Sequence, residues 1–262
     1  MCEIKRVRYE KCPLIEVTYQ LNFPTILSIE AEMPVRFQNA IRKDFPEYKM
    51  QTEQEGEITV NIKGEELSPI YKQRQAKKIH YFISEDGQWR ISLSKNQLSI
   101  STLKYKQWED LKEKFKTPLG AFIDIYDQSY FDRIGLRYID AIDKEKLNLK
   151  NVEWRELIQP HLLGCLGLDE DSYKIKSSVM NTEIVMEDVS VKISSGLGRI
   201  NQENNVAGEV FILDCDYFEA KKVEMSEIDK VSMKLHQKST SFFRKSITKK
   251  LHEVMEPQEI EV

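Results

Sequence analysis

Apolar and polar residues alternate along several short segments in the first half of the chain, a pattern typical of half-buried β-strands. Segments of this kind lie at 14–21, 57–62, 80–84, 89–93 and 97–101, and the most strand-like run is 130–142. Asp86 and Gly87 separate two of them, and an Asp-Gly pair favours the tight turn of a β-hairpin. We therefore expect antiparallel hairpins in this half.

Two other segments of the first half have helical spacing. Apolar residues at Phe37 and Ile41 share a face, Pro34 stands at the start of that helix, and Pro46 ends it. A longer helical pattern covers 108–126 and contains Pro118, which predicts a kink or two abutting helices.

Residues 63–78 are mostly charged and polar, and Gly64 and Pro69 break any regular period. The sequence therefore predicts a long loop between the strand at 57–62 and the strand at 80–84.

The second half has a similar but less clear pattern. A short helix begins at Trp154 and is interrupted by Pro160, and the segment 195–198 is interpreted as a turn. The strand candidates are 178–187, 189–194, 198–200 and 209–217. The chain is then expected to form one long helix over 226–255, bent near Ser239, with Ser226 as its N-cap and Asp229 at the capping-box position.

The order of these elements predicts an α+β protein with two similar halves. Each half would be an antiparallel sheet curved around long helices, in a helix-grip-like arrangement. We place the boundary so that residues 1–145 form an N-terminal α+β domain and residues 146–262 form a C-terminal α+β domain ending in the long helix.

Composition and charge limit the function classes. The 262 residues are 40% hydrophobic and 31% charged, which is the composition of a folded protein, and the net charge of -4 argues against a generally basic surface. The N-terminus has no apolar run of signal-peptide length, and no stretch approaches a membrane span. We therefore expect a cytoplasmic protein without a membrane partner.

The four cysteines are Cys2, Cys12, Cys165 and Cys215, which are widely spaced and form no C-x-x-C pair. We expect free thiols, because nothing in the sequence indicates secretion. The four histidines do not cluster with them, so the sequence predicts no zinc site and no other cofactor.

Several motifs together resemble a sporadically distributed bacterial protein family of unknown function that carries a TIGR-type family label. They are AIRKDFP at 40–46, FISEDGQWRISL at 82–93, YKQWEDL at 105–111, RIGLRYID at 133–140, LDCD at 213–216 and the segment 243–248. The resemblance covers most of the chain except 148–198. It implies no established activity, cofactor or catalytic residue, and the patchy distribution of the family suggests an accessory role in a bacterial defence or toxin-linked system.

Arg133 and Arg137 are four residues apart on one strand and therefore share a face, with Gly135 between them. Two guanidinium groups around a gap can hold a carboxylate or a phosphate. The alternative is that both arginines form ion pairs with acidic residues of neighbouring strands.

Asp214 and Asp216 also share a face of their strand. Two carboxylates can bind a divalent cation or act in acid–base chemistry, with further ligands from Glu183, Glu187 or Asp188. Alternatively, the two aspartates pair with the two arginines across the boundary between the halves.

A row of lysines follows the final predicted helix beside its apolar face: Lys230, Lys234, Lys238, Lys245 and Lys249. Such a row usually solvates a helix, but it would also suit a nucleic acid or an acidic protein partner.

No motif supplies a nucleophile together with its base. The leading hypothesis is therefore a non-enzymatic binding module for a protein partner or a small anionic ligand, with Arg133 and Arg137 as the contact residues. The alternatives are a metal-dependent enzyme on phosphate-bearing substrates that uses Asp214 and Asp216, and nucleic-acid binding through the final helix. That helix could also support a homodimer.

Overall fold

The computed structural model describes residues 7–53, 56–63, 66–73, 77–168, 175–199 and 208–259. Its main element is a nine-stranded, wholly antiparallel sheet. In order across the sheet, the strands are β11 (Val179–Met186), β12 (Val189–Arg199), β13 (Glu209–Glu219), β10 (Arg133–Asp143), β2 (Leu14–Asn22), β8 (Gln97–Thr102), β7 (Trp89–Ser94), β6 (Lys77–Ile83) and β3 (Glu47–Glu53).

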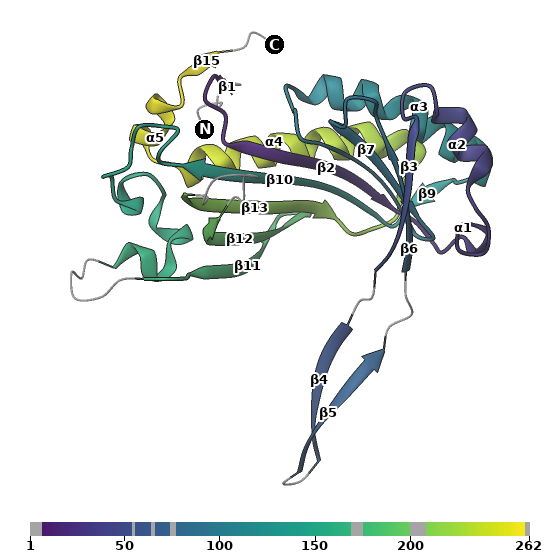
Figure 1. Cartoon of the computed structure of the whole chain (residues 1–262), viewed down its shortest axis with the longest axis horizontal. Helices are drawn as coiled ribbons and strands as arrows, with labels where there is room; N and C mark the ends of the chain where they lie inside the picture. The colour runs from purple at the N-terminus through teal and green to yellow at the C-terminus, as the bar shows by residue number, and fades with distance from the viewer. Residues whose placement is uncertain are drawn as a thin grey trace.

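Three short ribbons accompany this sheet. β1 (Val7–Tyr9) pairs with β15 (Pro257–Glu259), so the two ends of the described chain lie side by side. β9 (Tyr130–Phe131) pairs with β14 (Val223–Glu224). β4 (Gly56–Lys63) pairs with β5 (Glu66–Gln73), and this hairpin projects from the body of the molecule (Figure 1).

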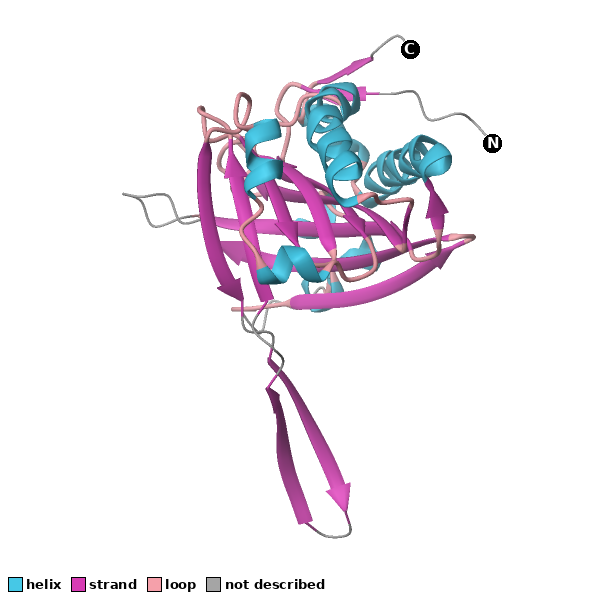
Figure 2. Cartoon of the chain, turned by 90° about the vertical axis from the view of Figure 1, so that its right-hand side faces the viewer, coloured by secondary structure: helices cyan, strands magenta, loops and turns pink. Residues whose placement is uncertain are grey.

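The main helices cover one face of the curved sheet (Figure 2). They are α1 (Leu27–Ala31), α2 (Val35–Ile41), α3 (Trp108–Tyr126), α4 (Ile228–Ser246) and α5 (Lys249–Val254). The shorter 3₁₀ turns are η1 (Trp154–Glu156), η2 (Pro160–Leu162), η3 (Gly164–Gly167) and η4 (Met225–Glu227). No helix within the described ranges has the length and apolar content to cross a membrane.

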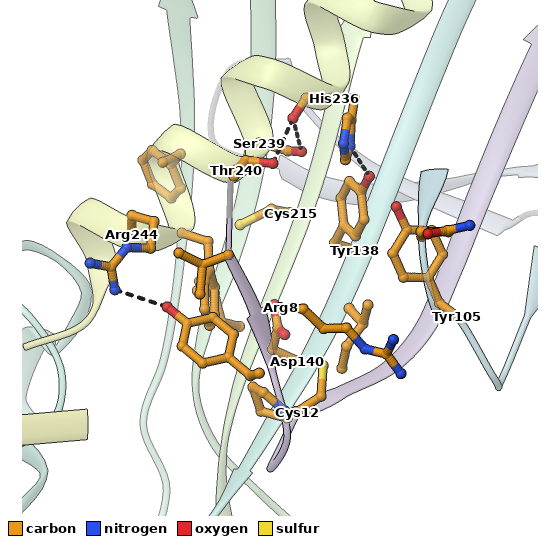
Figure 3. Close-up of a pocket in the computed structure, with 18 of the residues that line it drawn as sticks. Arg8, Cys12, Tyr105, Tyr138, Asp140, Cys215, His236, Ser239, Thr240 and Arg244 are labelled. Atoms are coloured by element: carbon orange, nitrogen blue, oxygen red, sulfur yellow. Dashed lines mark hydrogen bonds between the residues drawn. The ribbon is translucent and has the colours of Figure 1, made fainter. Parts of the chain in front are cut away.

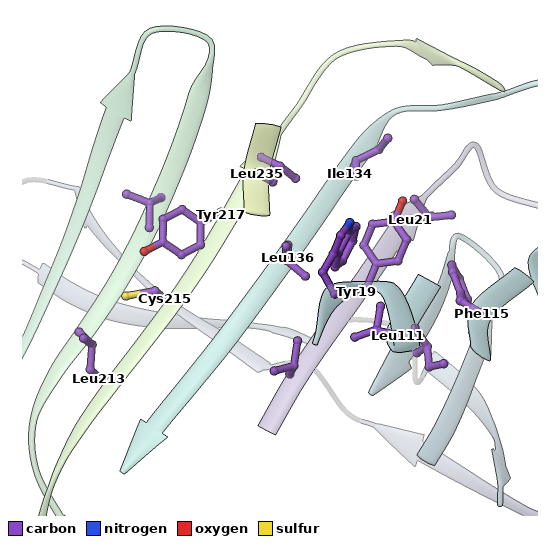
Figure 4. Packing of buried hydrophobic residues seen from close by; sticks show 14 of the residues in the cluster. Tyr19, Leu21, Leu111, Phe115, Ile134, Leu136, Leu213, Cys215, Tyr217 and Leu235 are labelled. Carbon is purple, nitrogen blue, oxygen red and sulfur yellow. The ribbon is translucent and has the colours of Figure 1, made fainter. Parts of the chain in front are cut away.

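One hydrophobic core joins the helices to the inner face of the sheet. Tyr19 on β2 packs edge-on against Trp108 and Phe115 of α3, and its hydroxyl lies 2.6 Å from Ser232 Oγ of α4. Leu136 of β10 and Leu235 of α4 are fully buried in the same cluster (Figure 4). The alternating apolar residues of β2, β10 and β13 therefore fix which face of the sheet receives the helices.

The expected α+β class and the antiparallel pairing of the strands are confirmed. Strands of both predicted halves, however, belong to the same nine-stranded sheet, because β10 pairs on one side with β2 and on the other with β13. The boundary at residue 145 falls just after β10, and the division into two domains stays a prediction.

Four local expectations need correction. The segment 63–78 is not a long loop: β5 lies within it and β6 begins at Lys77. The final helix does not run unbroken to Met255, because α4 ends at Ser246, Ile247 makes a bridge with Ile158, and α5 begins after Thr248.

The other two corrections concern caps and turns. Ser226 is not an N-cap, since it lies inside η4 and α4 begins after Glu227. Residues 195–198 do not form a turn either, because they continue β12 opposite β13. Pro118 lies within the single helix α3, so of the two alternatives expected there the pair of abutting helices is wrong and the kink stays a prediction.

Candidate functional site

A cavity of about 290 Å³ lies between α4 and the inner face of the sheet (Figure 3). Its floor comes from β10 and β13, its roof from α4, and its mouth from β1 and from the loop that carries Tyr105 and Lys106. This size approaches the lower end of the range typical of small-molecule sites, which are usually mostly apolar with a few polar groups.

The space exists because small side chains face one another across it. Ser239 and Thr240 occupy α4 between the large residues Leu235 and Phe242, and both hydroxyls bond to the carbonyl of His236, at 2.8 and 3.0 Å. Cys215 on β13 lines the same space from the opposite side. A helix with these short side chains cannot fill the gap above the sheet, so the cavity remains.

Asp140 of β10 lies on the inner face in an otherwise apolar series. It stands opposite Leu213 of β13, and the pairing with β2 shifts beside it so that Ile15 is an extra, bulged residue. Asp140 is 7% exposed and lines the cavity. Burial raises the pKa of its carboxyl to about 7, so close to neutral pH it exists as a mixture of the neutral and charged forms.

Two thiols share the cavity with Asp140 (Figure 3). Burial raises the pKa of Cys215 to about 12, and burial together with the nearby Asp140 also raises the pKa of the Cys12 thiol. Both cysteines are free, as is Cys165, while Cys2 lies outside the described residues. Cysteine chemistry needs a thiolate, so these protonated thiols act as cavity walls rather than as nucleophiles.

Aromatic side chains close the two sides of the cavity. The hydroxyl of Tyr138 shares a 2.9 Å hydrogen bond with Nδ1 of His236, whose ring stacks on Trp108 at 5.4 Å. Tyr217 is buried beside Phe242, and burial raises the pKa of its hydroxyl strongly. These contacts hold α4 at a fixed position above β10 and β13.

Arg244 brings a cation to the end of the cavity. Its Nη1 donates to the hydroxyl of Tyr9 at 2.9 Å, and that hydroxyl lies 2.9 Å from Nδ1 of His252. Desolvation and the neighbouring Arg244 lower the pKa of His252, so its ring is neutral at pH 7 and its Nδ1 can accept a hydrogen bond from the Tyr9 hydroxyl. The Arg244 Nε is buried and has no hydrogen-bond partner in the described part of the chain.

The exposed mouth of the cavity carries Arg8, Glu10 and Lys106. With Arg244, the described rim has three cations and one carboxylate, that of Glu10. Asp140 lies at the floor. The cavity thus offers a cationic entrance, mostly aromatic and aliphatic walls, and one carboxyl at its base.

Asp140 was not among the site residues predicted from the sequence. The signal was nonetheless present: Ile134, Leu136, Tyr138, Asp140 and Ile142 share the inward face of one strand. A carboxyl in an apolar series of this kind is expected to be paired or to serve a ligand.

The four residues that were predicted to bind a ligand lie on the opposite, outer face of the sheet. Nη2 of Arg133 lies 2.6 Å from Asp216, and Nε and Nη2 of Arg137 lie 2.7 and 2.5 Å from the two carboxylate oxygens of Asp214. The arginines and aspartates therefore pair with one another across β10 and β13, as the ion-pair alternative predicts.

Gly135 makes the first of these pairs possible. A Cβ at this position would lie 2.3 Å from Nη1 of Arg133, so the arginine side chain crosses the sheet directly over the glycine. Its guanidinium also covers the ring of Phe218, at 4.4 Å.

An open groove on the same outer face is lined by Arg137, Lys192, Asp214 and Asp216, with Asn181 and Glu183 from β11. Of the other suggested metal ligands, Glu187 pairs with Lys238 and Asp188 pairs with Lys234. Within the described ranges, no group of three or more histidine, cysteine or acidic residues is arranged to hold a metal ion.

The lysine row is divided by the break after α4. Lys234 contacts Asp188 and the buried Glu219, Lys238 lies 2.9 Å from Glu187, and Lys249 belongs to α5, where it lies 3.6 Å from Glu253. Lys230 and Lys245 have no ion pair among the described residues. The row is therefore not one continuous basic stripe.

Comparison with protein-family models and with curated proteins gave no match. The resemblance to the sporadic bacterial family therefore stays a prediction.

Proposed function

We propose that the chain is a non-enzymatic binding module whose ligand is a small anion held in the cavity beneath α4. The observation that carries the proposal is the cavity itself, a preformed space of about 290 Å³ with cations around its entrance and polar groups inside it. Ligand sites in proteins typically have this combination of a concave, mostly apolar space and a few convergent polar groups.

The charges favour an anion. Arg8, Lys106 and Arg244 border the cavity, and among the described residues of the rim Glu10 is the one carboxylate. Positive groups around a low-dielectric recess attract anions and bind them more strongly than they would in water. Arg244 is also held in place by Tyr9, so little ordering is required when an anion arrives.

The site differs from the one that the sequence indicated. Arg133 and Arg137 were the expected contact residues, but each is already paired with an aspartate on the outer face. The same pairs occupy the carboxylates that the metal-dependent enzyme hypothesis requires. The ion pairs of Lys234 and Lys238 likewise reduce the charge available for nucleic acid.

Isothermal titration calorimetry with a small panel of probes tests the proposal. The panel is inorganic phosphate, octane-1-sulfonate and octanoate as anions, with octylammonium as the cation of matched length. We expect at least one anion to bind with millimolar or better affinity and octylammonium to bind at least tenfold more weakly. If no anion binds, or if the cation binds best, the proposal is wrong.

A matched pair of variants locates the binding. Ser239→Leu fills the cavity from α4, whereas Ser241→Leu makes the same change on the same helix at a residue that does not line the cavity. We expect Ser239→Leu to lose at least tenfold in affinity and Ser241→Leu to retain it. Thr240→Leu provides a second filling variant if Ser239→Leu unfolds. Unchanged affinity in a folded filling variant contradicts this site.

The wider biological setting also belongs to this proposal. We place the protein in the cytoplasm, because Cys12, Cys165 and Cys215 are free thiols. We further propose an accessory role in a bacterial defence or toxin-linked system, with a protein partner or a second copy on the outward face of α4, where Met233 is 38% exposed. Native mass spectrometry of protein taken from its host would show a partner, a dimer or a bound ligand by mass.

The division into two similar halves, each a sheet curved around a long helix, remains a proposal as well. Separate expression of residues 1–145 and 146–262 tests it, because two independent domains would each unfold cooperatively. The single sheet shared by β2, β10 and β13 is the feature that such an experiment would divide.

A further inference from the structure

Asp140 is a buried carboxyl that lacks the usual compensation. It is more than nine-tenths buried, and burial alone accounts for its raised pKa, with no hydrogen bond or charge from a described side chain contributing. Carboxyl groups this deeply buried are normally paired, because removing an ionised carboxylate from water costs several kcal/mol. Its carboxyl borders the cavity rather than packed protein, so a ligand can supply the missing partner.

None of the described groups around Asp140 serves as its counter-ion. From the N-terminal segment, Arg8 and Glu10 stand at the exposed mouth and Tyr9 and Cys12 line the wall. From the loop before α3 come Tyr105 and Lys106, the latter exposed.

The sheet and α4 supply the remaining neighbours. Tyr138, Cys215 and Tyr217 face the cavity from β10 and β13, and His236 and Arg244 face it from α4. His236 bonds to Tyr138, and Arg244 donates to Tyr9. Burial raises the pKa of Tyr9, Cys12, Cys215 and Tyr217, so these groups remain neutral over the physiological range.

We propose that the ligand is a small apolar monocarboxylate, and that its carboxylate accepts a hydrogen bond from the protonated carboxyl of Asp140 while Arg8 and Arg244 balance its charge. This inference rests on the proposed function and specifies its ligand. Binding therefore takes up one proton from solution whenever Asp140 is ionised in the empty protein. The proton stays on the Asp140 oxygen and is shared with the ligand oxygen, and no covalent bond changes.

The alternatives fit these surroundings less well. An amine could pair with ionised Asp140, but it would have to pass and then face Arg8, Lys106 and Arg244. A neutral ligand would leave Arg244 Nε without a partner. A carboxylate satisfies both the acid at the floor and the cations at the rim.

The cavity volume limits the size of the ligand. Since a water molecule occupies about 30 Å³ of liquid, 290 Å³ corresponds to roughly ten non-hydrogen atoms. Octanoate has about this size and is therefore the probe of choice.

Calorimetric titration with octanoate at several pH values tests the proton uptake. Octanoate remains ionised from pH 6 to pH 8.5. If only protonated Asp140 binds it, the fraction of competent protein falls across this range and the affinity falls about thirtyfold. Titrations at pH 8 in two buffers with different ionisation enthalpies should report the uptake of close to one proton.

Asp140→Asn gives the decisive comparison, because the amide reproduces the uncharged donor. This variant should bind octanoate with an affinity that is independent of pH, about thirtyfold tighter than the wild type at pH 8.5. Asp214→Asn, on the outer face of the same sheet, is the matched control and should keep the wild-type pH dependence. Octane-1-sulfonate, a far weaker base with the same number of carbon atoms, should bind at least tenfold more weakly than octanoate.

Each outcome separates the two proposals. If the wild type binds none of the anionic probes at any pH, the proposed function itself is wrong. If octanoate binds with pH-independent affinity and no proton uptake, the anion site stands but the role of Asp140 is overturned. The same conclusion follows if Asp140→Asn retains the wild-type pH dependence or if the sulfonate binds as tightly as octanoate.

Discussion

The neighbouring strands β10 and β13 carry charged side chains on both faces of the sheet, and the two faces differ in whether those charges are paired. On the outer face, Arg133 and Arg137 pair with Asp216 and Asp214 within a hydrogen-bond length. On the inner face, Asp140 is buried beneath α4 without a partner among the described residues. The same two strands thus hold a set of satisfied charges on one side and one unsatisfied carboxyl on the other.

This difference shows why abundant charge is a poor guide to a binding site. An ion pair on the outer face stabilises the sheet modestly. Each of its charged groups already has a partner of opposite charge, so it gains little from binding a ligand. An isolated buried carboxyl costs folding free energy, and such a cost is typical of groups kept for function. This contrast is the reason why we propose a ligand site on the inner face.

The largest expected effect is the loss of folding stability that comes from burying the Asp140 carboxyl. Its folded pKa is about 7 against an ordinary value of 3.8, so between these values the folded state binds the proton more tightly than the unfolded state. The free energy of unfolding therefore falls as pH rises from about 4 to about 7, and is level above that range, with a total loss of up to about 4 kcal/mol.

Asp140→Asn should remove this loss. The variant is expected to match the wild type near pH 4 and to be more stable at pH 8, by up to about 4 kcal/mol. Urea unfolding of both proteins at pH 4, 6 and 8 measures the difference. If the difference in free energy of unfolding between the two proteins does not change with pH, the Asp140 carboxylate has a stabilising partner in solution. The contrast between the two faces would then disappear.

The next effect compares packing on the two faces. Leu136→Ala removes a fully buried side chain beneath α4 and should lower the free energy of unfolding by about 3 kcal/mol. Arg137→Ala, one residue along on the outer face, should cost less than about 1 kcal/mol because the pair it breaks is half-exposed. If chemical denaturation shows comparable losses in the free energy of unfolding for the two variants, the outer ion pairs contribute as much to stability as the buried core, contrary to our interpretation.

A smaller effect depends on Gly135. Gly135→Ala places a methyl group where the Arg133 side chain now lies, which should displace that side chain from Asp216 and Phe218 at a cost of about 1 kcal/mol or less. In an Arg133→Ala background the same change should be neutral or slightly stabilising, since alanine gives the unfolded chain a lower conformational entropy than glycine does. A double-mutant cycle followed by urea unfolding measures the coupling, and additive effects would contradict this role of the glycine.

The smallest effect is expected on the lysine row. Lys238→Ala breaks an exposed pair with Glu187 and should leave the free energy of unfolding within about 0.5 kcal/mol of the wild type. Fluorescence anisotropy with duplex DNA provides the functional check. DNA binding that falls steeply with salt, and weakens on neutralising Lys234 and Lys238, would revive the nucleic-acid alternative.

Much of the fold could be predicted because its signals are local. The alternation in β2, β7 and β8 and the periodicity of α3 depend only on which face of each element is buried. The helix break at Ile247 could not be seen, because it depends on a contact with Ile158, almost ninety residues away. The pairing of β10 with both β2 and β13, which joins the two halves, could not be predicted either, because periodicity does not show which strands are neighbours.

The site could be predicted only in part. The pairing of Arg133 and Arg137 with Asp216 and Asp214 was among the expected alternatives, because side chains four or two apart on a strand share a face. The cavity depends instead on the distance between α4 and the sheet and on the short side chains that line the gap, among them Ser239 and Cys215. Asp140 was detectable as an inward-facing acid, but its isolation emerges only from the packed structure.

The pairing of β1 with β15 has a consequence for the order of folding. Arg8 and Tyr9 reach the cavity from a strand whose partner residues are 257–259, the final segment that the structure describes. A contact between such distant parts of the chain closes a very long loop and forms late, after the more local hairpins. During synthesis the nine-stranded sheet can assemble first, and the mouth of the cavity is completed only when residues 257–259 have left the ribosome.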